Sequence, residues 1–227
     1  MRLYYMTSYE VALIILRERR MRLARFDRLN DPFELLSTSI ADREVRYVMK
    51  YLRDHWVSKI GIICMGLHWK SPVMWAHYAR NHTGICLGFD VPDELAREVK
   101  YSSEREKVVL DMTKEVRGIT SDLLERITTT KYAQWSYEEE WRLFARLEEK
   151  DPVNGEYYLP FGPSMTLREV IVGVRCKASV GSFRKIIGRA ESEIKIIRVR
   201  PAFDSFAMVQ QRNVTPIKIL PRSGARD

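Results

Sequence analysis

The sequence predicts an α+β domain in which helices flank a mixed, mostly antiparallel β-sheet. Amphipathic helical stretches alternate with short strand-like stretches along the chain. Hydrophobic residues make up 45% of the 227 residues, enough for a substantial core, and no internal repeat, low-complexity segment or linker divides the sequence. We therefore expect one α+β domain over residues 1–220, followed by a flexible C-terminal tail over residues 221–227.

The first sixty residues carry helix signals between strand-like stretches. Ser8 is a typical helix cap before a broad apolar face, and from Val45 onward apolar residues follow the spacing i, i+3, i+4, i+7 and i+11 of an amphipathic helix. The run Asn30-Asp31-Pro32 is typical of a turn. In order, we expect a strand over residues 3–6, a helix over 9–20, a strand over 21–24, a loop over 26–34 and a helix over 41–59.

The segment over residues 74–90 contains two histidines and three aromatic residues. Ser71 caps the short helix that leads into it, Pro72 takes the first helical position, and the helix ends at Gly84. The polar turn before this glycine is expected at the rim of a core. Around and after this segment we expect strands over residues 61–65, 85–89 and 99–101, a short helix opening at 91–93, and a long helix over 106–131.

From residue 138 the periodicity of the sequence changes from helical to alternating. Glu138, Glu140 and Arg142 fall on one face of an extended stretch that runs to residue 147, and apolar residues such as Leu143 fall on the other. The remaining expected elements are strands over residues 156–161, 169–174 and 194–200, a helix over 179–189, and a hairpin or edge pair over 203–211 and 214–220.

Glu138 and Glu140 are the first candidates for catalysis. On an extended backbone, two such carboxylates lie about 7 Å apart on one face, and Arg142 continues the row. Two acids beside an arginine can hold the hydroxyls of a ribose, stabilise a cationic transition state, or act as acid and base. The alternative is a solvent-facing sheet edge on which Glu and Arg alternate for solubility.

His82 is the third candidate catalytic residue, because imidazole titrates near neutral pH and a turn leaves it accessible. His77 on the preceding helix is either a binding residue or a partly buried structural histidine. Trp75 can stack on a base or a nicotinamide, or it is a core residue. The other candidate binding residues are Arg142, Tyr5, Asn30 and Asp31.

The charge of the chain favours an anionic partner. The net charge is +8; residues 17–28 hold six arginines against two acids, and residues 168–200 hold nine Lys and Arg against three glutamates. A basic surface favours nucleotides or nucleic acids, but arginines that only keep helices and edge strands soluble give the same composition. The oligomeric state is not predicted.

The cysteines and the hydropathy predict a cytoplasmic protein that does not enter a membrane. Three cysteines without a close pair indicate a reducing compartment, and no run of eighteen apolar residues or signal-peptide core is present. The cysteines and histidines over residues 64–86 show neither C-x-x-C nor H-E-x-x-H spacing, so we expect no metal. G-x-G-x-x-G, Walker A and G-x-S-x-G patterns are absent as well.

Several sequence blocks carry a family resemblance. They are L-Y-Y at residues 3–5, F-D-R-L-N-D-P-F-E at 26–34, M-W-A-H-Y-A-R-N-H-T-G-I-C-L-G-F-D at 74–90, V-K-Y at 99–101 and K-Y-A-Q-W-S-Y-E-E-E-W-R at 131–142. In this order they resemble the bacterial domain-of-unknown-function family catalogued as twenty-nine seventy-one, over roughly residues 1–175. The resemblance implies membership of that family and no particular activity.

The opening strand, the helix after it and the late E-x-E are similar, more remotely, to ADP-ribosyltransferase-like proteins. This similarity implies NAD as a cofactor, Glu140 as the glutamate that binds the ribose and Glu138 as the upstream acid. Tyr4 or Tyr5 takes the first-strand position that contacts NAD.

Three functions stay open on the sequence alone, and whether the chain is an enzyme is among the questions it leaves open. The first is a nucleotide-using transferase built on Glu140. The second is a basic nucleic-acid-binding protein or metal-independent nuclease with a defence or toxin role, which would use His77, His82, Glu140 and Arg142. The third is a non-catalytic binding module.

Overall fold

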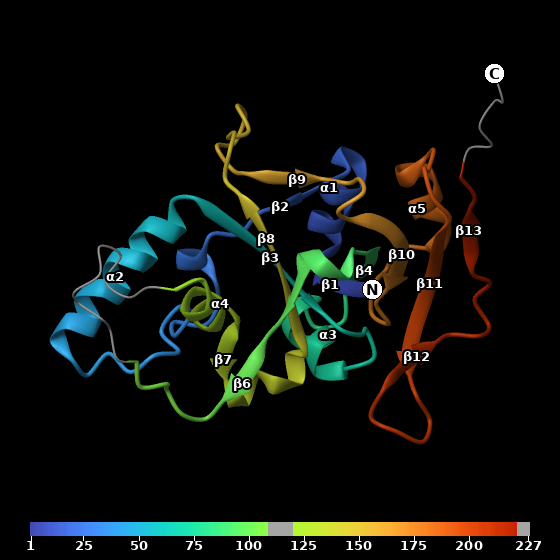
Figure 1. Ribbon diagram of the computed structural model, residues 1–227. Coiled ribbons are helices and arrows are strands. Elements are labelled where there is room, and N and C mark those ends of the chain that lie inside the picture. The colour runs from blue at the N-terminus through green and yellow to red at the C-terminus, as the bar shows by residue number, and fades with distance from the viewer. Residues whose placement is uncertain (109–119, 222–227) are drawn as a thin grey trace. The chain divides into compact units, whose positions relative to one another are not determined.

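The computed structural model describes residues 1–108 and 120–221 and has an α+β fold with a mixed, mostly antiparallel sheet, as predicted (Figure 1). By its internal contacts the chain divides into two compact units. Unit 1 comprises Met1–Met21, Met65–Leu95 and Pro160–Asp227, and unit 2 comprises Arg22–Cys64 and Ala96–Leu159. The single domain over residues 1–220 stays a prediction, and residues 222–227 of the expected tail lie outside the described residues.

Unit 1 is built on four strands in the order β11-β10-β4-β1. They are β1 (Arg2–Thr7), β4 (Ile85–Asp90), β10 (Thr166–Val172) and β11 (Ile194–Pro201). β4 pairs antiparallel with both β1 and β10, and β10 pairs parallel with β11. Two short strands, β12 (Met208–Gln210) and β13 (Ile217–Ile219), each pair with β11 at different positions. Of the predicted hairpin or edge pair, the structure therefore has strands paired at the sheet edge, and the two strands pair with β11 and not with each other.

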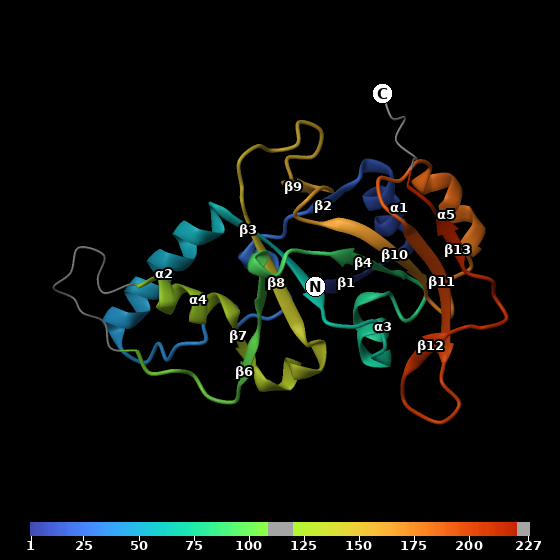
Figure 2. The same ribbon diagram turned by 45° about the vertical axis from the view of Figure 1, so that its right-hand side comes forward.

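The helices of unit 1 begin where the sequence predicts. They are α1 (Tyr9–Glu18), α3 (Pro72–Tyr78) and α5 (Val180–Ile187), and each is capped by a serine hydroxyl that accepts a backbone N–H from the first turn. Tyr9 and Phe183 meet edge to face, with ring centroids 6.0 Å apart, where α1 contacts α5. Figures 1 and 2 both show α1 and α5 on one side of β1 and β4 and α3 on the other side. The short helix expected after β4 is the 3-10 helix η2 (Asp93–Leu95).

The helix α3 ends at Tyr78, earlier than the predicted end at Gly84. Arg80, Asn81 and His82 follow with positive φ angles of 46°, 54° and 68°, which makes a left-handed turn. Gly84 is required by close approach, because a Cβ atom there would lie 2.1 Å from the backbone oxygen of Thr7. The turn therefore lies tightly against β1.

Unit 2 packs its helices against short strands. In both views α2 (Arg43–Val57) and α4 (Ser121–Thr129) lie side by side, and β6 (Lys100–Ser102) runs beside β7 (Thr130–Tyr132) (Figure 2). β8 (Glu140–Arg146) pairs antiparallel with β5 (Ala96–Glu98), and the 3-10 helices are η1 (Phe26–Arg28) and η3 (Ala133–Glu138). The apolar core of this unit consists of Phe26, Leu35, Val45, Met49, Ile62, Leu123 and Ile127. Three of the four unit boundaries fall within β2 (Arg20–Arg22), β3 (Ile60–Gly66) and β9 (Tyr158–Pro160), and the fourth lies between η2 and β5.

The long helix expected over residues 106–131 differs from the structure. Glu106 forms a β-bridge with Thr38, α4 ends at Thr129, and the next three residues form β7; residues 109–119 lie outside the described residues. The hydroxyls of Thr128 and Thr129 donate to backbone oxygens of the preceding helical turn. Such bonds weaken a helix end, and β-branched residues favour a strand where a partner strand is available.

Across the described ranges, no helix combines the length and the apolar character that crossing a bilayer requires.

Candidate functional site

Five charged side chains from separate elements of unit 2 meet in its interior. Glu34 comes from the loop after η1, Lys131 from β7, Glu138 from η3, and Glu140 and Arg142 from β8. No side chain of this group, here called the ion cluster, is more than 4% exposed. Charged residues are almost never buried this deeply unless they are paired, so their mutual geometry decides what they can do.

The two cations of the ion cluster are shared among its three carboxylates. Lys131 Nζ lies 2.6 Å from Glu138 Oε2 and 3.0 Å from Glu140 Oε2. Arg142 donates from Nη1 and Nη2 to the two oxygens of Glu34, at 3.0 and 2.7 Å, and from Nε to Glu140 Oε1 at 2.8 Å. Its Nη1 also donates to the backbone oxygen of Thr128 at 2.6 Å. Both oxygens of Glu140 therefore accept from a cation.

The backbone around Glu139 differs from the expected extended stretch. Glu138 closes the 3-10 helix η3, Glu139 follows with a left-handed φ of 43°, and β8 begins only at Glu140. Glu138 and Glu140 still converge, because the turn at Glu139 brings both carboxylates onto the same ammonium group. The alternative of a solvent-facing row is wrong for these residues, since Glu138, Glu140 and Arg142 are all buried.

Opposite charges set the protonation states in the ion cluster. Burial opposes ionisation of Glu140, but Arg142 and Lys131 outweigh it and lower the pKa of Glu140 to about 2. Burial also opposes the charge of Lys131 and Arg142, yet the neighbouring carboxylates raise both pKa values. Glu34 differs: burial raises its pKa even though Arg142 binds it. Glu140 therefore stays ionised at neutral pH, far from the range that suits a general base.

Two uncharged residues complete the surroundings of Glu140. Its backbone N–H donates to the Tyr101 hydroxyl at 2.9 Å, and burial raises the pKa of Tyr101 to about 12. The partly buried Cys64 thiol also bonds to the Glu140 carboxylate, and desolvation raises the pKa of Cys64 well above its usual value. Both groups are neutral near pH 7, so they add hydrogen bonds and no charge.

A groove lies on the other face of the two-stranded sheet that carries Lys131. In the parallel β6–β7 pair, Tyr101 is in register with Lys131, and both side chains reach the ion cluster. Side chains alternate along a strand, so the residues before and after them face the opposite way. A cavity of about 410 Å³ opens there, lined by Phe33, Leu36, Ser37, Ser102, Ser103, Glu104, Arg105, Thr130, Lys131 and Tyr132.

The walls of this groove are two loops held together by backbone bonds. Glu106 N–H donates to Ser37 O at 2.9 Å, and Ser39 N–H donates to Glu106 O at 2.7 Å. The Arg105 guanidinium lies 4.8 Å from the centre of the Phe33 ring. Phe33 is 51% exposed and Tyr132 is 47% exposed, so two aromatic rings stand open to solvent in the groove lining.

A second cavity overlaps this groove and adds further cations. It measures about 500 Å³ and shares Ser37, Ser102, Glu104, Arg105 and Thr130 with the first. Its own contributions are Lys100, Glu106 and Lys107, of which Glu106 is paired with Arg126. The groove therefore combines aromatic surface, hydroxyls and an excess of positive charge, the features that favour an organic anion.

Comparison with known families identifies the central part of the chain. Residues 74–143 match the model of a family described as "Protein of unknown function (DUF2971)". The segment is similar to this family and is here called the DUF2971 segment. The predicted extent of residues 1–175 is longer than this match. No curated protein and no solved structure matches the chain. The similarity to ADP-ribosyltransferase-like proteins therefore stays a prediction.

The DUF2971 segment contains four of the five ion-cluster residues and begins one residue before Trp75. Sequence analysis missed Glu34 and Lys131 as site residues, although each closes or opens one of the blocks at 26–34 and 131–142. Their positions at the ends of these two sequence blocks were the only indication in the sequence that Glu34 and Lys131 belong to the site. Nothing in the local sequence showed that Glu34 and Arg142, 108 positions apart, bind each other.

The remaining candidates of the DUF2971 segment lie in unit 1. Trp75 is fully buried, and its indole N–H donates to Trp69 O at 2.6 Å. His77 lies on the last turn of α3. Within the described residues, His82 Nδ1 is a buried atom without a hydrogen-bond partner, and burial together with Arg175 lowers the pKa of this histidine. The imidazole of His82 is therefore mainly neutral at neutral pH.

The other predicted binding residues have local structural contacts. In unit 1, Tyr4 OH lies 3.0 Å from Glu169 Oε2, and Tyr5 is its neighbour on β1. In unit 2, Asp31 is buried and accepts the backbone N–H of Phe33 at 2.9 Å, so it shapes the loop that carries Phe33 and Glu34. Asn30 precedes it in the same loop. Across the described residues, no group of three or more His, Cys, Asp and Glu suits a metal ion.

Proposed function

We propose that unit 2 binds a nucleotide in the groove above β6 and β7. The observation that carries this proposal is that two solvent-exposed aromatic rings lie with Arg105 in one cavity of about 410 Å³, and that Lys100 and Lys107 line the overlapping cavity. A base can stack on Phe33 or Tyr132, at a gain of about 1–3 kcal/mol per base. Arg105 and Lys100 would meet the phosphates, and the serine hydroxyls would meet the sugar.

The ion cluster supports this groove in the proposal without touching the ligand. On the face of the sheet opposite the groove, Lys131 of β7 is held by its bonds to Glu138 and Glu140. Tyr101 of β6 is held by the bond that its hydroxyl accepts from the backbone N–H of Glu140. The strand residues on either side of these two face the groove, so a shift of Lys131 or Tyr101 would move the residues that face the ligand. These residues are Lys100, Ser102, Thr130 and Tyr132. The proposal therefore assigns Glu138, Glu140 and Arg142 a positioning role.

The proposal is tested by titrating the full chain with ADP, adenosine and NAD, using calorimetry. We expect ADP to bind, Tyr132→Ala to weaken it about tenfold by loss of stacking, and Arg105→Gln to weaken ADP more than adenosine. Phe206→Ala is the control, because Phe206 is an exposed aromatic residue of unit 1 and lies outside the groove lining. ADP affinity that none of the groove variants changes would refute the proposal.

NAD in the same titration separates a binding module from a transferase. A transferase would release nicotinamide, which chromatography detects, and Glu140→Gln would abolish that release while the variant still unfolds cooperatively. Binding of NAD without nicotinamide release supports a binding module. The buried and fully paired carboxylate of Glu140 favours the binding module.

A second candidate function, nucleic-acid binding, is favoured by the exposed face of α2. Arg43, Lys50 and Arg53 are exposed on this helix together with Tyr47 and Tyr51, against the acids Glu44 and Asp54. Cations interleaved with aromatic residues fit a single strand. By contrast, most arginines over residues 17–28, the predicted basic region, are in ion pairs with Glu18, Asp27, Glu156 or Glu191.

The nucleic-acid candidate predicts a salt dependence that a nucleotide site does not. Binding of single-stranded RNA should fall steeply with salt, and the slope should drop by about one for each phosphate contact removed in Arg43→Ala, Lys50→Ala or Arg53→Ala. RNA affinity with no salt dependence would remove this candidate.

A further inference from the structure

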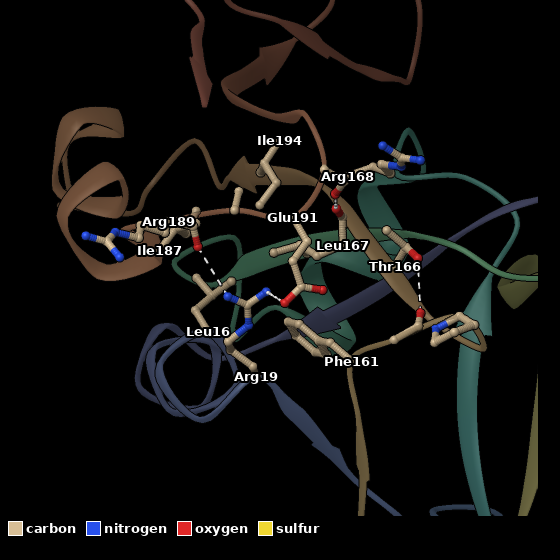
Figure 3. A pocket seen from close by; sticks show the side chains of 14 residues that line it. Leu16, Arg19, Phe161, Thr166, Leu167, Arg168, Ile187, Arg189, Glu191 and Ile194 are labelled. Atoms are coloured by element: carbon tan, nitrogen blue, oxygen red, sulfur yellow. Dashed lines mark hydrogen bonds and ion pairs between the residues drawn. The ribbon is translucent and has the colours of Figure 1, made fainter. Parts of the chain in front are cut away.

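A separate cavity of about 370 Å³ lies entirely within unit 1 (Figure 3). Its lining comes from the end of α1, from the turn and first residues around the start of β10, and from the segment between α5 and β11. A volume of this size suits a small organic ligand. Most of its wall is apolar, formed by Leu16, Phe161, Pro163, Leu167, Ile187 and Ile194.

Three arginines line this cavity, and only one of them, Arg19, faces the other lining side chains; Figure 3 shows the guanidinium of Arg189 extending away from them. Arg19 donates to Glu191 at 3.1 Å and to the backbone oxygen of Arg189 at 3.2 Å, and Figure 3 shows its guanidinium turned toward Glu191 beside Phe161. The hydroxyls of Thr166 and Ser192 already donate to backbone oxygens. Arg168 is bound to Asp90, and its guanidinium points away from the other lining side chains (Figure 3).

The ion pair of Arg19 and Glu191 is exposed, which makes it easy to open. The Arg19 side chain is 42% exposed and that of Glu191 is 81% exposed. Exposed pairs of this kind add little to stability, because solvent screens them and two flexible side chains must be held in place. A ligand carboxylate can therefore replace Glu191 on the guanidinium, where a planar fork matches a carboxylate well.

The backbone of Arg19 adopts a conformation that is uncommon for a non-glycine residue. Arg19 caps α1 in the left-handed region, at φ 54° and ψ 42°, a position that glycine usually occupies at a helix end. Its N–H donates to Ile15 O at 2.8 Å, and its carbonyl accepts from Phe161 N–H at 2.8 Å. A long charged residue in a strained backbone position commonly marks a functional site.

We propose that this cavity binds a small amphipathic monocarboxylate. The apolar chain of the ligand packs against Leu167, Ile194 and their neighbours, and its carboxylate binds Arg19 in place of Glu191. With one facing cation and an apolar wall, the cavity differs from the groove of unit 2, where several cations and two exposed rings suit a nucleotide. This binding site is independent of the function proposed for unit 2.

Octanoate, with 1-octanol as its neutral counterpart, tests the proposal by calorimetric titration of the full chain. We expect octanoate to bind at least tenfold more tightly than octanol. Arg19→Gly should abolish that preference without lowering the melting temperature, because glycine adopts the left-handed cap without strain. Glu191→Gln should tighten octanoate binding several-fold by removing the internal competitor.

The matched control is Arg17→Ala, since Arg17 is exposed on the same helix and does not line the cavity. It should leave octanoate binding unchanged. Three results would overturn the proposal: no octanoate binding to the wild-type chain, equal binding of octanol and octanoate, or a preference for octanoate over octanol that survives Arg19→Gly.

Discussion

Each unit contains a network of arginines and carboxylates with similar distances, and the two networks differ in burial. In unit 1, Arg2 and Arg168 bind the two oxygens of Asp90 at 2.8 and 2.7 Å. In the ion cluster of unit 2, Arg142 binds Glu140 and Glu34 at 2.8 and 2.7 Å. The side chains of the first set are 34–39% exposed, whereas Arg142 is fully buried.

The comparison teaches that distance alone does not show what an ion pair contributes. At the surface, water solvates each charge when its partner is removed, so the pair is worth about 0–1 kcal/mol. In the interior, a charge whose partner is removed stays unsolvated, so breaking the pair costs about 3–5 kcal/mol. We infer that the ion cluster holds β6, β7 and β8 in place, while the Asp90 network contributes little.

The largest effect is expected for Arg142→Met, which keeps an unbranched apolar stem and removes the charged guanidinium. Glu34 and Glu140 would lose their shared cation, and Thr128 O would lose a donor. The free energy of unfolding should fall by about 3–5 kcal/mol, measured by urea unfolding with circular dichroism. A decrease of less than about 1 kcal/mol in the free energy of unfolding would show that the buried network contributes no more than a surface ion pair.

Acid should act on the two networks through their carboxylates. The pKa of Glu140 is lowered from 4.5 to about 2, so its contribution is complete above its unfolded pKa and is lost as pH falls from about 4.5 to about 2. The pKa of Asp90 is lowered too: burial opposes its ionisation, and Arg2 and Arg168 outweigh burial. Glu34 acts in the opposite sense, because burial raises its pKa and protonation of Glu34 favours the folded state as pH falls.

Glu140→Gln should therefore flatten the acid limb of a stability curve recorded between pH 2 and pH 5. Asp90→Asn should change the same limb much less, because the Asp90 side chain is 38% exposed and solvent screens its pairs. Equal flattening by both variants would contradict the role given to burial.

The smallest effect is expected for Arg168→Met, the surface counterpart of Arg142→Met. Asp90 keeps Arg2 as a partner, and water replaces the lost guanidinium. The urea midpoint should correspond to a loss of about 0–1 kcal/mol. A loss above about 2 kcal/mol would show that the surface network is more strongly coupled than its exposure indicates.

Local sequence patterns predicted most elements of this fold. The apolar spacing from Val45 predicted the helix α2, and the caps Ser8 and Ser71 predicted the starts of α1 and α3. The failures came where long-range pairing decides: Thr130 joins β7 because β6 is beside it, and β12 and β13 each pair with β11. A single sequence does not encode these partners locally.

The candidate site was predicted only in part, for the same reason. The E-x-E and the arginine after it were found from spacing, but their burial and their partners Lys131 and Glu34 were not. Alternation of charged residues looks the same at a solvent-facing edge and in a paired interior. Only the tertiary structure separates these two cases.

The central claim is that Glu140 is held for structure, and the stability of Glu140→Gln tests it most directly. Glutamine keeps the shape of the side chain and removes the charge that Lys131 and Arg142 share. We predict that urea unfolding at pH 7 shows a loss of about 3 kcal/mol relative to the wild-type chain. An unchanged or increased free energy of unfolding would contradict the account, because removing a carboxylate that is kept for chemistry at the expense of stability typically leaves a protein as stable or more stable.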